Sequence, residues 1–198
     1  MDSAQFASRY GPWALIAGAS EGTGASFARQ SAEKGLNLIL VARREGPLDQ
    51  LAQELRAAHG VECVTASIDL AAEVATDQLL AAAGGREVGL LVLNAGADSN
   101  GSMFLDNAIA NWNALTIRNV MTTMQALHAF ATPMRERRRG GLIVVGSGAC
   151  YAGLPGSLRR RALPQCSSVR AATLALLLLM PRSAAISSRL AGPSRRSR

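Results

Sequence analysis

The sequence predicts an α/β fold in which about five parallel strands form one doubly wound sheet with helices on both faces. Short aliphatic runs alternate with longer segments of helical periodicity over the first 150 residues. Hydrophobic residues make up 48% of the chain and aromatic residues only 4%, a balance typical of parallel strands that are buried on both faces. A repeated strand, helix and parallel strand gives this architecture through right-handed crossovers.

The predicted elements follow one another in strict alternation. The strands are Trp13–Ala17, Leu36–Ala42, Val61–Ala66, Val88–Leu93 and Leu142–Val145. The helices between them cover residues 22–34, 47–59, 71–83 and 111–138. Glycines directly after the first three helices are suited to end them. Ligands of such sheets bind beyond the carboxyl ends of the strands, so the loops there are where chemistry is expected.

Charge divides the chain into two regions. Residues 1–157 carry 12 Lys and Arg against 14 Asp and Glu, a net charge of −2, whereas residues 158–198 carry nine Arg and no acid, a net charge of +9. We therefore expect a folded domain over 1–157 and a basic, disordered or non-native tail over 158–198. The tail could be an arm for nucleic acid or anionic lipid. Translation of a GC-rich gene in the wrong frame would also produce its Arg, Ser, Pro, Ala and Leu, and we favour this interpretation.

Several other classes of protein are disfavoured. Cys63, Cys150 and Cys166 lack metal-ligand spacing, and His59 and His128 have no Cys or carboxylate cluster, so no metal site is expected. The first ten residues do not resemble a secretory signal, and the longest apolar run, 171–180, is shorter than the roughly 20 residues of a membrane span. A cytoplasmic protein without a membrane partner is expected. The basic run 135–139 is interpreted as a solvated helix end rather than a nucleic-acid patch.

The loop after the first predicted strand has the composition of a phosphate-binding turn. It contains Gly18, Ser20, Glu21, Gly22, Thr23 and Gly24, and a helix opens directly from it. Glycines permit the tight turn and a close backbone approach, and the helix N-terminus offers free N–H groups to phosphates. The strand–loop–helix context predicts that these residues bind the pyrophosphate of a dinucleotide.

Two arginines at the end of the second predicted strand indicate which dinucleotide. An acidic residue about 20 residues beyond the glycines holds the ribose 2′-hydroxyl of NAD in such folds. This chain has Arg43 and Arg44 there instead, and guanidinium groups suit a 2′-phosphate. NADP(H) is therefore the preferred cofactor and NAD(H) the alternative, while a plain pair of surface arginines stays open.

The spacing Gly-x-x-x-Gly-x-Gly resembles that of the short-chain dehydrogenase/reductase family, and further landmarks over residues 11–157 agree. The resemblance implies a Rossmann-type NAD(P)-binding domain that transfers hydride between nicotinamide and a small alcohol or ketone. It also implies that Asp69 and Leu70 border the adenine and that Asn94, Ala95 and Gly96 steady the sheet beside the cofactor. Asn119 matches the family's helical Asn of the active site, and Ser147 its substrate-polarising Ser.

The family's catalytic Tyr and Lys, which stand four residues apart, have no counterpart here. Spacing from Ser147 places them at positions that hold Arg160 and Pro164. The chain has only two tyrosines, Tyr10 and Tyr151, and its sole lysine is Lys34, so no Tyr-x-x-x-Lys pair exists in it. The match ends abruptly after residue 157, which favours a disrupted or shifted reading frame. The family's later strands are expected to be missing.

Three functions follow from these observations. The first is an NADP(H)-dependent oxidoreductase of the resembled family whose catalysis is lost in this chain. The second is a noncatalytic NADP(H)-binding module, and the third a basic-tailed binder of nucleic acid or membrane surfaces. The last of the five strands would leave an open sheet edge. The family's dimer or tetramer is therefore expected to be compromised.

Overall fold

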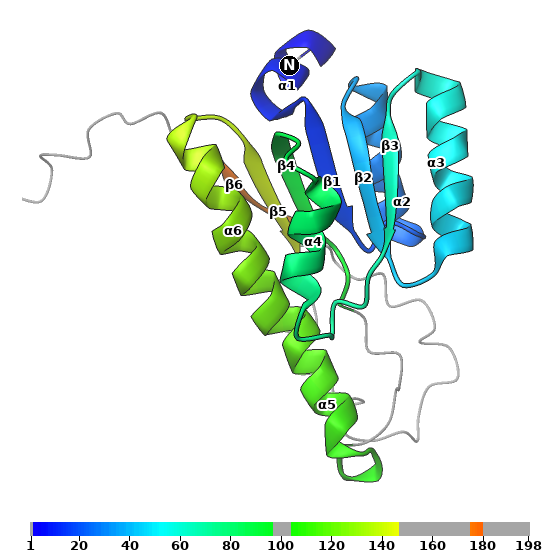
Figure 1. Ribbon diagram of the computed structural model, residues 1–198, viewed down its shortest axis with the longest axis vertical. Helices are drawn as coiled ribbons and strands as arrows, with labels where there is room; N and C mark the ends of the chain where they lie inside the picture. Colours follow the sequence, from blue (N-terminus) through cyan, green and yellow to red (C-terminus); the bar gives the residue numbers. More distant parts are fainter. Residues whose placement is uncertain (1, 97–103, 147–174, 180–198) are drawn as a thin grey trace, which may run out of the picture.

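The computed structural model describes residues 2–96, 104–146 and 175–179, which form one sheet flanked by helices (Figure 1). The strand order is β3-β2-β1-β4-β5-β6. The first five strands are parallel: β1 (Trp13–Ala17), β2 (Asn37–Ala42), β3 (Cys63–Ser67), β4 (Val88–Leu93) and β5 (Gly141–Val145). The sixth, β6 (Ala175–Leu179), pairs antiparallel with β5. The doubly wound parallel fold predicted from the sequence is confirmed.

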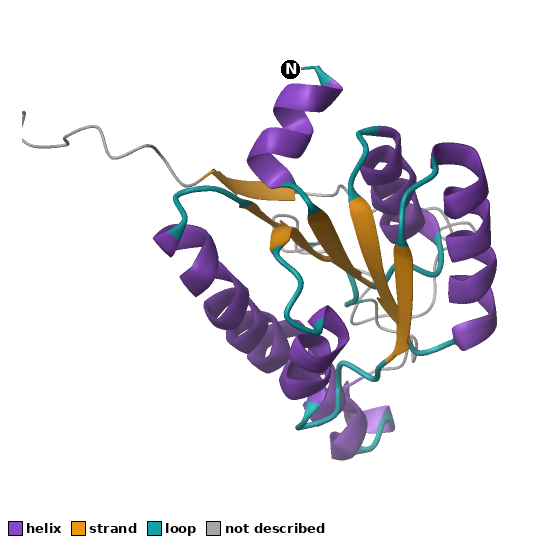
Figure 2. Ribbon diagram, turned by 45° about the horizontal axis from the view of Figure 1, so that its top comes forward, coloured by secondary structure: helices purple, strands orange, loops and turns teal. Residues whose placement is uncertain are grey.

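Helices cover both faces of the sheet, as Figure 2 shows. They are α1 (Ser3–Tyr10), α2 (Gly22–Glu33), α3 (Glu45–His59), α4 (Ala75–Ala83), α5 (Ile109–Thr116) and α6 (Thr122–Glu136). A short 3-10 turn, η1 (Phe104–Asp106), precedes α5, and a π-helical segment, η2 (Ile117–Met121), joins α5 to α6. Helix α5, segment η2 and helix α6 follow one another without a break and form the one long helical stretch that the sequence predicts at 111–138. None of the helices in the described part of the chain is both long and apolar enough to cross a membrane.

Alternation along the central strands divides the core into two layers. Ile16 and Leu40 point to one face, where they join a cluster that includes residues of α2 and α3. Leu15 and Ile39 point to the other, where they join a cluster with residues of α4 and α6. All four side chains are fully buried. The strands are therefore aliphatic throughout because neither face meets water.

Strand β6 corrects the expectation that the sheet ends at β5. It lies inside 158–198, where no strand was predicted, and its residues come from the Leu-rich run that was noted only for being too short to span a membrane. Register pairs run from Gly141 with Leu179 to Val145 with Ala175, so β5 is not the edge strand. An aliphatic segment of this kind can satisfy the free hydrogen-bonding groups of a strand edge. The remainder of 158–198 lies outside the described residues, and the boundary at 157 stays a prediction.

Helix α1 was not predicted, although the sequence contains a signal for it. Asp2 accepts a hydrogen bond from the backbone N–H of Gln5 at 2.7 Å, and the Gln5 side chain accepts from the Asp2 N–H at 3.3 Å. This reciprocal arrangement is a capping box, which satisfies the first N–H groups of a helix. The helix ends with Tyr10 buried at 5% exposure, and Phe6 contacts its ring.

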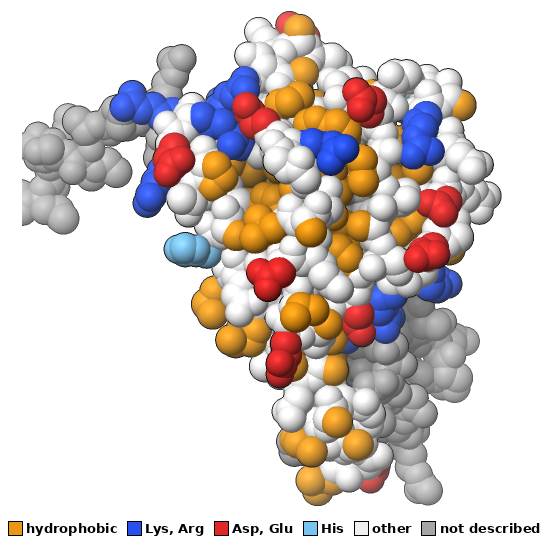
Figure 3. Space-filling view, viewed as in Figure 1, with side chains coloured by type: hydrophobic (Ala, Val, Ile, Leu, Met, Phe, Trp, Pro, Cys, Tyr) orange, Lys and Arg blue, Asp and Glu red, His pale blue; other side chains and the backbone are white. Residues whose placement is uncertain are grey.

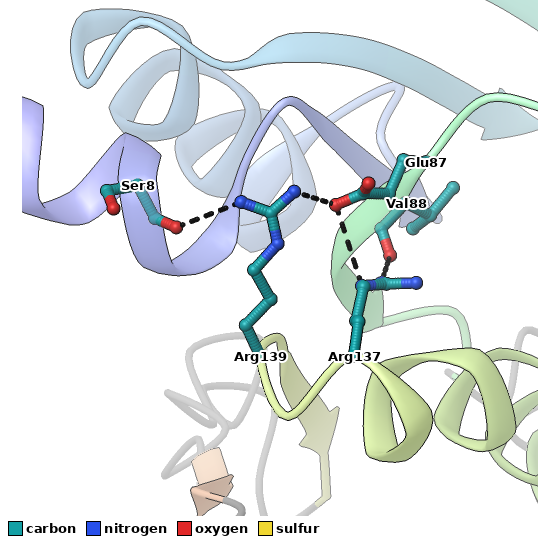
Figure 4. Close-up of polar contacts among 5 residues, drawn as sticks. All are labelled: Ser8, Glu87, Val88, Arg137 and Arg139. Atoms are coloured by element: carbon teal, nitrogen blue, oxygen red, sulfur yellow. Dashed lines mark hydrogen bonds and ion pairs between the residues drawn. The ribbon is translucent and has the colours of Figure 1, made fainter.

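The basic run 135–139 is more than a solvated helix end, which corrects that interpretation (Figure 4). Arg137 and Arg139 both reach Glu87, with N···O distances of 3.5 and 2.5 Å. Arg137 also donates to the carbonyl oxygen of Val88, and Arg139 donates to that of Ser8 at 3.4 Å. These arginines therefore connect the end of α6 to β4 and α1. Sequence spacing could not reveal this because Glu87 lies about 50 residues away in the chain.

Candidate cofactor-binding site

The loop after β1 is closed by glycines at positions where no side chain fits. Gly18 has φ +84°, and a Cβ there would lie 2.8 Å from the backbone nitrogen of Ala95. A Cβ on Gly24 would overlap the carbonyl oxygen of Gly18 and lie 2.8 Å from Nδ2 of Asn94. Two loops that are distant in sequence, after β1 and after β4, therefore touch backbone to backbone, and only glycine permits this approach.

Hydrogen bonds hold this loop to its neighbours on both sides. The N–H of Gly18 donates to the carbonyl of Val41 in β2 at 2.7 Å. On the other side, the Asn94 side chain donates from Nδ2 to the carbonyl of Gly18 at 3.2 Å. The Asn94 N–H donates to the carbonyl of Ala17 at 3.0 Å. The ends of β2, β1 and β4 are thus joined into one rigid edge.

The N-terminus of α2 is built to receive an anion. Glu21 is its N-cap residue, but its side chain makes no capping hydrogen bond. Gly22, the first helical residue, has φ +56°, and a Cβ there would meet nothing within 4 Å. The first N–H groups of a helix have no intrahelical partner, and the positive end of the helix dipole lies at the same place, which is the arrangement that binds phosphate. The residues present fit a dinucleotide.

A cleft of about 610 Å³ opens at this edge of the sheet. This volume lies within the usual range for cofactor sites. Its lining includes ten of the predicted binding residues: Gly18, Ser20, Glu21, Arg43, Arg44, Asp69, Leu70, Asn94, Ala95 and Gly96. Gly22, Thr23 and Gly24, which form the first turn of α2, are predicted binding residues that are not among its lining residues. Ala42, Ile68 and Arg118 line it as well and were not predicted.

The two arginines after β2 differ in their surroundings. Arg44 donates from Nη2 to Oε2 of Glu21 at 2.8 Å, an ion pair whose side chains are 61% and 77% exposed. Arg43 forms no ion pair with any described residue, and its carbonyl accepts a hydrogen bond from Ser67 at 3.0 Å. The mouth of the cleft thus carries one free guanidinium and one that an acid of the glycine loop holds in place.

Asp69 lies in the cleft but also supports its own turn. Its Oδ1 accepts a hydrogen bond from the Ala71 N–H at 3.0 Å, and its carbonyl accepts one from the Ala72 N–H at 3.0 Å. These bonds close a local turn and do not cap a helix, because α4 begins at Ala75 with Val74 as its N-cap residue. Asp69 also lines the cleft, as the family resemblance implies for a residue that borders the adenine.

Asn119, which the resemblance assigns to the active site, lies against the loop after β4. It lies in the π-helical segment η2 and donates from Nδ2 to the carbonyl of Leu115 at 2.9 Å. A Cβ on Gly96 would overlap its Oδ1, so the amide stands directly against that loop. Ser147, the other predicted catalytic residue, lies outside the described residues.

Arg118 is the charged residue among the three lining residues that sequence reasoning missed. It precedes Asn119 in the same π-helical segment and is partly buried beside the cleft. Its position next to Asn119 was the available signal, but a single arginine on a helix gives no indication of the direction of its side chain. The sequence alone therefore could not separate it from a surface cation.

Comparisons with known proteins agree with this geometry. The family model "short chain dehydrogenase" matches residues 12–158. A very-long-chain 3-oxoacyl-CoA reductase of Laccaria bicolor is 34% identical over 146 residues, which are 72% of this chain and 43% of that protein. A solved 7beta-hydroxysteroid dehydrogenase has a TM-score of 0.70 at 32% identity, with 75% of this chain and 57% of that chain covered.

A further solved neighbour contains a cofactor. The short-chain dehydrogenase from Sphingobium yanoikuyae in complex with NADPH has a TM-score of 0.67 at 29% identity, with 72% of this chain and 56% of that chain covered. The chain spans about half the length of the proteins that it matches. The matched segment includes the glycine loop after β1, the loops after β2 and β4, and the long helix. The chain therefore belongs to the short-chain dehydrogenase family.

Proposed function

We propose that this chain binds NADP(H) in the cleft beyond β1, β2 and β4. The observation that carries the proposal is the position of Arg43 and Arg44, which line the same cleft as the glycine loop. The 2′-phosphate of NADP carries extra negative charge, and guanidinium groups bind phosphate through paired hydrogen bonds. The solved neighbours in complex with NADPH support the preference over NAD(H).

The chain's own residues divide the work of binding. The first turn of α2 would accept the pyrophosphate, and Arg43 would meet the 2′-phosphate without giving up an existing ion pair. Asn94 keeps the two glycine-contacting loops together and so fixes the width of the cleft. When bound, the nicotinamide supplies the hydride that the family transfers. Asn119 would orient polar groups beside it from η2.

We propose further that hydride transfer is lost or very slow. Neither the buried Tyr10 nor Lys34 lines the cleft: Tyr10 lies in the core against Phe6, and Lys34 is the C-cap residue of α2. Neither of these two residues can therefore protonate a substrate there, and the other tyrosine, Tyr151, lies outside the described residues. General acid–base assistance contributes about 10²–10⁴ in rate, so a chain without it should be slower by about that factor.

The names of the relatives support a proposal for the substrate class. The matched proteins are named as reductases of 3-oxoacyl-CoA and dehydrogenases of hydroxysteroids, and these substrates carry a ketone or a hydroxyl. Any residual activity of this chain is proposed to act on an alcohol or ketone, and these names do not support the small size that the sequence-based expectation gave to it.

We propose a cytoplasmic location for this protein.

We also propose that its assembly is impaired. Figure 3 shows apolar side chains exposed on the face formed by α4 and α6. Val120, Met121 and Met124 of the long helix are 43–57% exposed. If no second copy covers them, the chain should aggregate at high concentration, which light scattering would report.

Cofactor titration tests the proposed function. The full chain should quench or enhance NADPH fluorescence at micromolar concentration and bind NADH more weakly. The double substitution R43M/R44M should remove the difference between the two cofactors, with R29M as a matched surface control. A chain that is folded by circular dichroism and binds neither cofactor would refute the proposal. If cofactor binds and stopped-flow detects no oxidation with ketones, a noncatalytic module is supported.

A further inference from the structure

Arg118 carries an inference beyond the general assignment of the cleft. It is the third arginine of the lining and the only one that comes from the long helix, since Arg43 and Arg44 follow β2. The cleft therefore receives cations from two separate parts of the chain, the segment after β2 and the long helix. An arginine on a partly buried helix face needs a partner, so its surroundings decide what it can bind.

The direction of Arg118 follows from its helical neighbour. Thr122 stands one turn later and is 3% exposed, and its Oγ1 donates to the carbonyl of Leu70 at 2.9 Å. Side chains one turn apart share a helix face. Arg118 therefore faces the segment that follows β3, and both Ile68 and Leu70 of that segment line the cleft with it.

The guanidinium of Arg118 has no partner among the described residues. Its Nε is buried and makes no hydrogen bond. No described carboxylate pairs with it, although Asp69 lines the same cleft. Asp69 uses one carboxylate oxygen for the Ala71 N–H instead. A partly buried cation without a hydrogen bond is costly, and a flat electron-rich ring or an anion compensates for it.

The position of the adenine can be worked out from the sheet. Arg43 and Arg44 stand at the end of β2, and under the proposed function they hold the 2′-phosphate, which is attached to the adenosine ribose. Strand β3 is the neighbour of β2 in the sheet, and the Ile68 N–H donates to the carbonyl of Ala42 at 3.1 Å. The base would then lie between the ends of these two strands, where the resemblance of Asp69 and Leu70 to the family's motif also implies the adenine, beside the segment that Arg118 faces.

We propose that Arg118 is an adenosine-binding residue whose guanidinium contacts the face of the adenine ring. The inference rests on the proposed NADP(H) function and names a contact within it. A guanidinium over an aromatic face is favoured by the charge distribution of the ring, and its planar shape permits stacking. Arg118 thereby adds affinity for the adenosine half of the dinucleotide and none for the nicotinamide half.

Fragment binding by calorimetry tests this proposal in the full chain. The probes are 2′,5′-ADP, which carries the adenine and the 2′-phosphate, and nicotinamide mononucleotide, which carries neither. R118M keeps an unbranched side chain without charge, and R118Q keeps a shorter polar side chain without charge. Both should weaken 2′,5′-ADP binding on the order of tenfold and leave the mononucleotide unchanged. The matched control is R135M, since Arg135 is exposed in the last turn of α6.

The outcomes separate this inference from the proposed function. If the unmodified chain binds 2′,5′-ADP and both Arg118 variants bind it equally well, the Arg118 contact is refuted while the cofactor assignment stands. An equal loss for the mononucleotide would also overturn it, because the contact would not belong to the adenosine half. If the unmodified chain binds neither NADPH nor 2′,5′-ADP, the proposed function itself fails. Thermal melting of each variant shows whether it remains folded. If R118M does not remain folded, the binding measured for R118Q decides the question.

Discussion

Substitution of Gly24 by Ala should disrupt the cofactor site from within the fold. The new Cβ would overlap the carbonyl oxygen of Gly18 and lie 2.8 Å from Nδ2 of Asn94. Ordinary carbon–oxygen contacts are about 3.3 Å or longer, so the first turn of α2 must move by roughly 1 Å. Neither neighbour can yield easily, because the Asn94 side chain and the Gly18 carbonyl are bonded to each other at 3.2 Å.

The cost of this change can be estimated from its parts. Overpacking a close contact costs about 1–3 kcal/mol, and loss of the Asn94 hydrogen bond costs about 1 kcal/mol more. We therefore expect G24A to lower the free energy of unfolding by about 2–4 kcal/mol. Because the displaced turn is also the phosphate-binding one, NADPH affinity should fall at least tenfold beyond the loss of folded protein.

Urea denaturation and NADPH titration of the same samples measure the two effects. The matched control is G46A in α3, where a Cβ would meet nothing within 4 Å and the backbone has no positive φ. That change should leave NADPH binding intact and raise the free energy of unfolding by about 0.5 kcal/mol, because alanine restricts the unfolded chain. If G24A unfolds at the same urea concentration as the parent and binds NADPH equally well, the loop contact described here is wrong.

Three further substitutions probe separate contacts. E21Q removes the acid that pairs with Arg44 at 2.8 Å, so NADPH should bind a few-fold more tightly and NADH about as before; a weaker NADPH complex in titration would show that Glu21 helps by positioning Arg44. T122V deletes the buried hydrogen bond to Leu70 and should cost about 1–2 kcal/mol in urea denaturation, whereas T132V, on the exposed part of α6, should cost less. E87Q weakens the contacts to Arg137 and Arg139, with an expected loss of about 1 kcal/mol that shrinks in high salt; an equal loss at all salt concentrations would contradict an electrostatic cause.

The sequence was informative where local chemistry decides structure. The predicted strands Trp13–Ala17 and Val88–Leu93 match β1 and β4 residue for residue, because both are buried aliphatic runs with turns at each end. Prediction was weaker at helix starts. Helix α4 begins at Ala75 rather than at residue 71, since Asp69 turns the chain before the helix can form. Strand β6 was missed because its pairing with β5 depends on a partner about 35 residues away.

Sequence alone determined the parallel sheet, the glycine loop, the arginines after β2 and the lack of a Tyr-x-x-x-Lys pair. These features depend on residue type, order and short spacing, which the chain displays directly. Only the tertiary structure showed that Glu21 pairs with Arg44, that Asn119 stands against Gly96 and that Arg118 faces the cleft. Such contacts depend on the direction of side chains from elements packed together, and no local pattern records that direction.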